Sequence, residues 1–156
     1  MVERKGLVTV SETVVDTTLR LLQGFVDREC VVLWLGRRTA VGVEVLNAWR
    51  PPQVTESHMF YIPPAAMEEL HDRLRRGRLM VAAQVHTHPE EAFHSAADDR
   101  WAIVRHQSAL SLVLPYFASR VSSQTFFEHT KVFRLSADDT WLEVPQLEVG
   151  SWLQVR

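Results

Sequence analysis

The strongest constraint on the fold of this chain is the apolar run Leu79–Val85, which ends in His86-Thr87-His88-Pro89. Such a run predicts a strand. Because successive side chains in a strand point to opposite faces, His86 and His88 are expected on one face, with Thr87 on the other. Proline cannot donate to a sheet ladder, so the strand must end at Pro89. The pattern therefore places two imidazoles together at a strand end.

The segment after this turn offers a third metal-ligand type. Ser95-Ala96-Ala97-Asp98 is typical of a helix start, with Ser95 as a plausible N-cap and Asp98 in the first turn. If this helix packs under the strand end, Asp98 could reach back toward His86 and His88. Two neutral imidazoles and one carboxylate would leave a fourth position for water, which is the open arrangement of a catalytic zinc. The alternative is that the two histidines lie on the surface, or are buried and simply form hydrogen bonds within the fold, since this spacing also arises by chance.

Composition limits the classes of protein that remain. The chain has 156 residues, 46% hydrophobic and 23% charged, which predicts a single domain spanning residues 1–156. The net charge of −2 and the lack of a long basic run argue against a nucleic-acid partner. No apolar run approaches a membrane span or a signal core, so we expect no membrane partner and a cytoplasmic location. The lone Cys30 excludes an internal disulfide and suits a reducing compartment.

The remaining chain alternates predicted helices and strands. Helices are predicted at residues 11–27, 65–76 and 96–107, and strands at 29–36, 40–49, 110–115, 124–135 and 141–144, with 53–62 as a loop containing a short strand. Segments 29–36 and 40–49 are expected to form an antiparallel hairpin. This order predicts a mixed α/β domain in which helices flank one twisted sheet.

Glu29 stands at the start of an otherwise apolar strand. A solvated strand end would explain it, because most glutamates at element ends are exposed. If this strand neighbours the one that ends in His86, Glu29 could instead face the open position of the ion and accept a proton from its bound water.

Together Glu29, His86-Thr87-His88-Pro89 and Ser95-Ala96-Ala97-Asp98 resemble the JAMM motif of the JAB/MPN metalloprotease family, whose members are zinc isopeptidases, many of them deubiquitinases. The resemblance covers roughly residues 29–115 and implies the MPN fold. It implies zinc bound by His86, His88 and Asp98. It also implies that Glu29 is the general base and that Ser95 donates a hydrogen bond to the oxyanion. Helix capping is the alternative role of Ser95.

The spacing of the motif leaves one choice open. The usual eukaryotic form has seven residues between the second histidine and the serine, whereas Pro89 to His94 is six. A strict count would move the two roles to Ala96 and Asp99. Ser95 and Asp98 are preferred because the serine role needs a hydroxyl, and bacterial members resemble this shorter loop. Asp99 remains an alternative ligand.

The resemblance also implies a function and partners. It implies a zinc isopeptidase that cleaves after the C-terminal glycine of a ubiquitin-like modifier or its conjugate, in a bacterial pathway with E1- and E2-like proteins, including anti-phage systems. One alternative is a metal-free MPN scaffold, and another is a peptidase that processes a sulfur-carrier protein.

The segment 53–62 is expected to line the groove for the modifier's tail, because the corresponding segment of the family borders the substrate channel. In the alternative, Met59 and Phe60 simply pack inward. The other histidines without a partner at ligand spacing are expected on the surface or on helix faces, namely His58, His71, His106 and His129.

Overall fold

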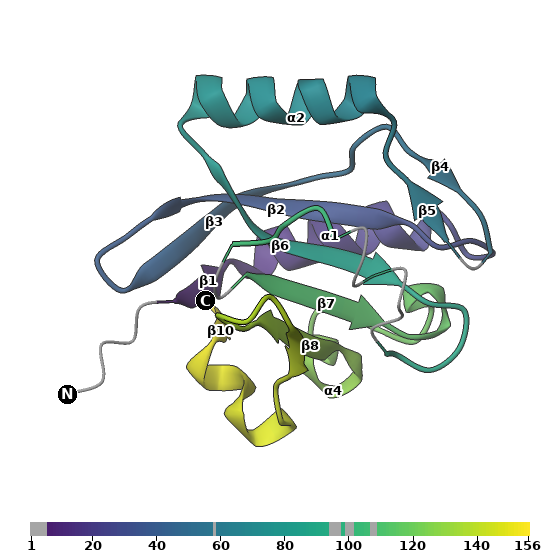
Figure 1. The fold of residues 1–156 in the computed structure, drawn as a ribbon. Helices are drawn as coiled ribbons and strands as arrows, with labels where there is room; N and C mark the ends of the chain where they lie inside the picture. Colours follow the sequence, from purple (N-terminus) through teal and green to yellow (C-terminus); the bar gives the residue numbers. More distant parts are fainter. Residues whose placement is uncertain (1–5, 58, 94–97, 99–101, 107–108) are drawn as a thin grey trace.

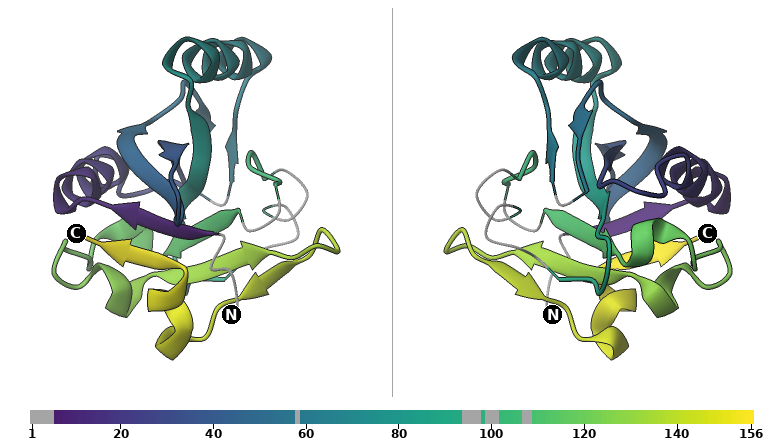
Figure 2. Two further views of the ribbon diagram at one scale, coloured as in Figure 1. Left: turned by 90° about the vertical axis from the view of Figure 1, so that its left-hand side faces the viewer. Right: turned by 90° about the vertical axis from the view of Figure 1, so that its right-hand side faces the viewer.

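The protein folds around one twisted mixed sheet. The computed structural model describes residues 6–57, 59–93, 98, 102–106 and 109–156. Its eight-stranded sheet has the order β10-β1-β3-β2-β6-β7-β8-β9, and helices pack against it from different sides (Figures 1 and 2). The predicted fold class, a mixed α/β domain with helices flanking a twisted sheet, is therefore confirmed.

The element bounds are as follows. The strands of the main sheet are β1 (Leu7–Val10), β2 (Val31–Arg38), β3 (Gly42–Trp49), β6 (Met80–Thr87), β7 (Leu110–Leu114), β8 (Lys131–Leu135), β9 (Trp141–Glu143) and β10 (Leu153–Val155). A separate two-stranded sheet consists of β4 (Val54–Thr55) and β5 (Phe60–Tyr61). The helices are α1 (Glu12–Gln23), α2 (Pro64–Gly77), α4 (Phe126–His129) and the 3-10 turns η1 (Tyr116–Ala118) and η2 (Gln146–Ser151).

The centre of the sheet is buried on both faces. β2 lies between β3 and β6 and is antiparallel to both, as the predicted hairpin requires for β2 and β3. On one face Val32 and Trp34 pack with the apolar side of α1, and on the other Val31 and Leu33 join the cluster that includes Leu70 of α2. Because neighbouring residues of β2 feed different clusters, the strand must be apolar throughout, which explains its nearly unbroken apolar sequence.

Helix α1 begins where the sequence predicts and ends earlier. The Val14 amide donates to the Ser11 side chain at 3.1 Å, so Ser11 is the N-cap. The helix stops at Gln23 rather than at residue 27, because the chain turns at Gly24. Val26 is 65% exposed, so a longer helix would not have extended the buried face.

Two predicted elements differ from the structure. Residues 102–106 are not helical, although a helix was expected to continue to residue 107. Instead, the Ile103 amide donates a hydrogen bond to Gln84 Oε1, and the His106 ring forms a hydrogen bond with the Val81 carbonyl. This segment therefore lies alongside β6. Similarly, only Lys131–Leu135 of the predicted strand 124–135 is a strand. The short helix α4 precedes it, because the Phe126 ring stacks on Trp34 in the core.

Several other elements were missed or only partly predicted. The segment 53–62 forms the β4–β5 hairpin, and Trp141–Glu143 pairs with β8 as expected. The short strands β1 and β10 were not predicted: β10 is an edge strand paired only with β1, and β1 is held between two parallel partners, β10 and β3. In the described part of the chain, no helix has the length and apolar character needed to cross a membrane.

Candidate metal centre

His86 and His88 are fixed at the end of β6 by the strands on either side. His86 lies opposite Val31 of β2 and opposite Val113 of β7. Beyond the strand end, the His88 amide donates to the Leu114 carbonyl at 2.9 Å, and the His88 carbonyl accepts from the Phe117 amide at 2.8 Å. Both imidazoles are almost completely buried, and their ring centroids lie 5.2 Å apart. The sheet therefore orients the two rings before any ion binds.

Asp98 completes a cluster of three ligand-type side chains. Its Oδ2 atom lies 3.3 Å from His86 Nε2 and 3.0 Å from His88 Nε2. One ligand atom from each of the three residues lies within 4.8 Å of the others. Two imidazole nitrogens and a carboxylate oxygen are a donor set that suits zinc and related transition metals. The structure thus brings together the three residues that the sequence predicts as ligands, and the cluster could hold a metal ion.

Glu29 reaches the site from the neighbouring strand. Glu29 is buried, at 4% exposure, and lies two residues before the first residue of β2. The Glu29 amide donates to the Glu56 carbonyl at 2.7 Å, which ties this backbone to the β4–β5 hairpin. The alternative of a solvated strand end does not hold, because Glu29 is buried and its carboxyl interacts electrostatically with His88 and Asp98.

The environment of Glu29 changes its acidity. Burial raises the pKa of the Glu29 carboxyl from 4.5 to about 7, and the charge of Asp98 acts in the same direction. His88 acts in the opposite direction, by a smaller amount than burial. A carboxyl with such a pKa exchanges protons near neutral pH, as a general acid–base group must.

Thr87 connects the strand of Glu29 to the strand of the histidines. The Cys30 amide donates to Thr87 Oγ1 at 3.2 Å, and the Thr87 amide donates to the Cys30 carbonyl at 3.1 Å. The side chain of Thr87 thus points away from the metal cluster, as the strand alternation predicts. Its hydroxyl fixes the residue that follows Glu29.

Gln84 has a comparable role that the sequence reasoning missed. Its Nε2 atom donates to Ser111 Oγ on β7 at 3.0 Å, and its Oε1 atom accepts from the Ile103 amide at 2.9 Å. This buried amide therefore anchors the chain a few residues after Asp98. The available signal was one polar residue inside the apolar run 79–85.

Two aromatic rings lie against the imidazoles. The Phe60 ring of β5 is tilted against His86, with centroids 5.8 Å apart, and the Phe93 ring meets His88 edge-on at 4.5 Å. Phe60 packs inward, as one alternative for this segment held, whereas Met59 is 48% exposed. Phe93 is 54% exposed and was not singled out from the sequence, where it is simply an apolar residue in a polar loop. Both rings limit access of water to the cluster.

Some predicted site residues cannot be placed. Ser95, Ala96 and Asp99 lie outside the described residues, and so does His94. The oxyanion and capping roles of Ser95 and the alternative ligand Asp99 therefore stay predictions.

Comparison with known proteins places this geometry in context. No family model matches the chain. The solution structure of protein DSY2949 from Desulfitobacterium hafniense has a similar fold, with a TM-score of 0.70, 17% sequence identity and coverage of 96% of this chain and 93% of that one. A Sinorhizobium fredii protein named "Probable metalloprotease y4jG" is 31% identical over 121 residues, which cover 75% of this chain and 73% of that protein. With this relative and the buried His86, His88 and Asp98 cluster, the chain belongs to a metalloprotease family and is a metal-dependent hydrolase.

Proposed function

We propose that the protein is a zinc-dependent isopeptidase of the JAB/MPN type, which cleaves after the C-terminal glycine of a ubiquitin-like modifier. The observation that carries the proposal is the convergence of His86, His88 and Asp98 beside the buried Glu29. These residues come from two adjacent strands and the segment between β6 and β7, in the order of the JAMM motif. The metalloprotease relative supports a peptidase reaction.

The three proposed ligands indicate what a bound metal would do in the reaction. Zinc bound by two imidazoles and one carboxylate would supply a Lewis acid that polarises the scissile carbonyl and lowers the pKa of water. His86 and His88 would bind through Nε2, since these are the atoms that face Asp98 Oδ2. The carboxylate of Asp98 would offset part of the positive charge in a buried site.

Glu29 is proposed to move the proton. In the metal-free site burial raises the pKa of Glu29, and a bound cation would favour its carboxylate form, which can accept a proton from the attacking water; the resulting acid can then protonate the leaving amine. The hydrogen bond from the Glu29 amide to the Glu56 carbonyl fixes the backbone of Glu29 and so restricts the positions that its carboxyl group can reach. Ser95 is proposed as the hydrogen-bond donor to the oxyanion of the tetrahedral intermediate.

The β4–β5 hairpin is proposed to hold the substrate tail. An extended peptide binds well beside a strand edge, because its main chain then supplies the hydrogen bonds. The hairpin touches the site at Phe60 and Glu56, and its other apolar side chains are exposed at Val54, Met59 and Tyr61. Phe93, whose ring packs against His88, would contact the substrate from the side opposite Phe60. A glycine-rich tail suits a path between two such aromatic rings.

The biological setting is proposed from the family resemblance. We infer a bacterial conjugation pathway of the kind found in anti-phage systems, with E1- and E2-like proteins as partners. Processing of a sulfur-carrier protein would use the same residues. The identity of the cleaved modifier distinguishes these settings.

The test is cleavage of defined fusions by the zinc-loaded protein. Ubiquitin-like proteins, each extended beyond its terminal glycine by a short peptide, would be incubated with the enzyme and examined by intact-mass spectrometry. Cleavage directly after the glycine is expected, with loss of turnover in Glu29→Gln. Glu44→Gln is the matched control, because Glu44 is an exposed glutamate on β3. Cleavage at other bonds, or equal turnover in Glu29→Gln, would contradict the proposal.

A further inference from the structure

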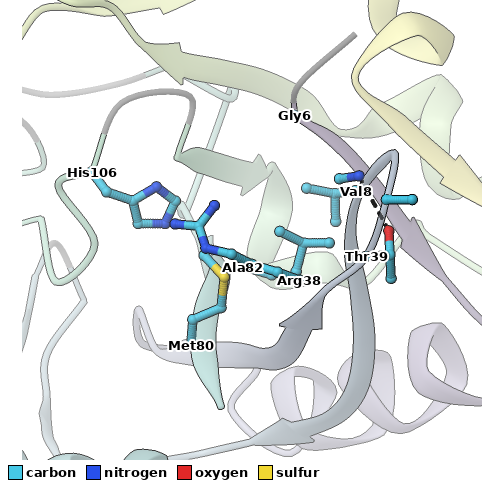
Figure 3. Close-up of a pocket in the computed structure, with 10 residues that line it drawn as sticks. Gly6, Val8, Arg38, Thr39, Met80, Ala82 and His106 are labelled. Carbon is cyan, nitrogen blue, oxygen red and sulfur yellow. Dashed lines mark hydrogen bonds between the residues drawn. The ribbon is translucent and has the colours of Figure 1, made fainter. Parts of the chain in front are cut away.

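A second cavity lies at the opposite end of the sheet from the metal cluster (Figure 3). Its volume is about 470 Å³, within the range of small-molecule sites. In the pairing of β2 with β6, Val31 lies opposite His86 and Gly36 lies opposite Met80, which lines the cavity. His86 lies six positions after Met80 along β6, or about 20 Å away at the usual rise per residue. The cavity is therefore separate from the metal centre.

The walls of the cavity are apolar and belong to the core. Val8 of β1, Val43 of β3 and Ala82 of β6 are each less than a tenth exposed, and Met80 packs against the same core cluster. These strands also support the main sheet, so the walls are rigid. Such a surface favours the apolar body of a ligand.

The polar side chains that line the cavity are Arg38, Thr39 and His106, of which Arg38 carries a permanent positive charge. Arg38 extends across it toward the ring of His106, and both residues line it (Figure 3). The His106 Nε2 atom lies 3.0 Å from the Val81 carbonyl oxygen, which can only accept, so this nitrogen bears the hydrogen and the ring is held in place. No carboxylate side chain lines the cavity within the described ranges, and none of the described acidic residues forms an ion pair with Arg38. His106 is thus a cavity residue rather than a helix-face residue.

Further arginines lie at this edge of the sheet, together with the acidic residues Asp72 and Glu44. Arg37, next to Arg38 on β2, donates to the Gly77 carbonyl at 2.9 Å and so brings the end of α2 to this edge of the sheet. That end carries Arg75, Arg76 and Arg78, of which the first two pair with the single Asp72. The metal end of the sheet instead holds the carboxyl groups of Glu29 and Asp98. The positive charge of Arg38, which lines the cavity, would therefore attract an anion into it.

From this geometry we propose that the cavity binds a small carboxylate with an apolar body. The guanidinium of Arg38 would bind the carboxylate in a two-pronged contact, which matches the planar shape of both groups. The apolar chain would lie against Val8, Val43 and Ala82. The site needs no metal and is distinct from the proposed peptidase site.

The test uses hexanoate as the probe and hexylamine as a matched ligand of opposite charge. Backbone amide shifts of the zinc-loaded protein would be followed by NMR during titration to about 10 mM, which detects millimolar affinities. Saturable shifts at Val8, Val43 and Ala82 are expected with hexanoate and not with hexylamine. Arg38→Gln should weaken hexanoate binding by about tenfold or more, as loss of a charged hydrogen-bonding partner implies.

The control variant is Arg20→Gln, because Arg20 is an exposed arginine on α1 and does not line the cavity. It should bind hexanoate like the unmodified protein. Thermal stability and metal content should be the same in both variants, which separates loss of the site from loss of the fold. The proposal is overturned if hexanoate gives no saturable shifts, if hexylamine gives the same shifts, or if Arg38→Gln binds hexanoate unchanged.

Discussion

The Cys30 amide donates to Thr87 Oγ1 at 3.2 Å while the Thr87 amide donates to the Cys30 carbonyl at 3.1 Å. Each residue adjoins a predicted functional group, since Cys30 follows Glu29 and Thr87 separates His86 from His88. A displacement of either strand would change the distance between Glu29 and the three proposed ligands, His86, His88 and Asp98. This pair of hydrogen bonds therefore sets the geometry of the site.

Thr87→Val should keep the fold and impair turnover. Valine has the shape of threonine but leaves the buried Cys30 amide without its side-chain acceptor, which costs about 1–3 kcal/mol of unfolding free energy. Thr87→Ser, which retains the hydroxyl, should restore most of the activity. Thr13→Val, at an exposed position of α1, is the control. Full activity of Thr87→Val with normal stability would argue against a positioning role.

Removal of a proposed ligand should remove the metal. We expect about one zinc per chain in the unmodified protein and close to none in His88→Ala or Asp98→Ala, measured by elemental mass spectrometry. His71→Ala, in an exposed histidine of α2, should retain the metal. If stoichiometry follows Asp99→Ala rather than Asp98→Ala, the ligand set is wrong.

Glu29 should make the metal-free protein less stable as pH rises. The pKa of Glu29 in the folded state, about 7, exceeds its ordinary value of 4.5, so the folded state binds the proton more tightly than the unfolded state. The contribution is complete below pH 4.5 and is lost as pH rises through about 7. Melting temperatures of chelator-treated protein across this window should fall less for Glu29→Gln than for the unmodified protein. An identical pH dependence in both would show that the glutamate is not buried as described.

Cys30 should be unreactive while the protein is folded. Its side chain is fully buried, and burial raises the pKa of the thiol to about 11, so almost no thiolate exists at neutral pH. Iodoacetamide should label it only after addition of denaturant, as followed by intact mass. Rapid labelling of the native protein would contradict both the burial and the raised pKa.

Gln84→Leu should lower metal affinity without touching a ligand. It removes the acceptor of the Ile103 amide and the donor to Ser111, so the chain that follows Asp98 loses its anchor to β6. Supporting residues of this kind change metal affinity by about 10–100-fold when mutated. Competition with a fluorescent zinc chelator measures the change, and equal affinity in Gln84→Leu and the unmodified protein would exclude the anchoring role.

The sequence predicts the central part of the fold well because its signals are local. Leu79–Val85 and the hairpin of β2 and β3 are apolar runs with clear ends, and both are strands in the structure. The proximity of His86 and His88 follows from strand alternation alone. The approach of Asp98 depends on the path of the intervening loop, so the helix-start pattern at Ser95 indicated it only if that helix packs under the strand end, and the motif resemblance added support.

The errors occur where tertiary contacts decide the structure. Residues 102–106 have a helical pattern, but Gln84 and the Val81 carbonyl bind this segment in a non-helical form. Phe126 belongs to a region with partial strand alternation, and its contact with Trp34 favours a short helix. In each case a partner distant in sequence overrides a weak local preference.

The position of His86 between β2 and β7, beneath the ring of Phe60, also bears on rates of exchange. The rings of Phe60 and Phe93 lie against the two imidazoles, and an ion that leaves past them must wait for these rings to move. The rate at which a strong chelator removes the ion would then equal the rate of local opening of the β4–β5 hairpin. Above a low chelator concentration, this rate would no longer rise with chelator concentration. Such kinetics would keep a peptidase loaded through brief periods of zinc scarcity, whatever its equilibrium affinity.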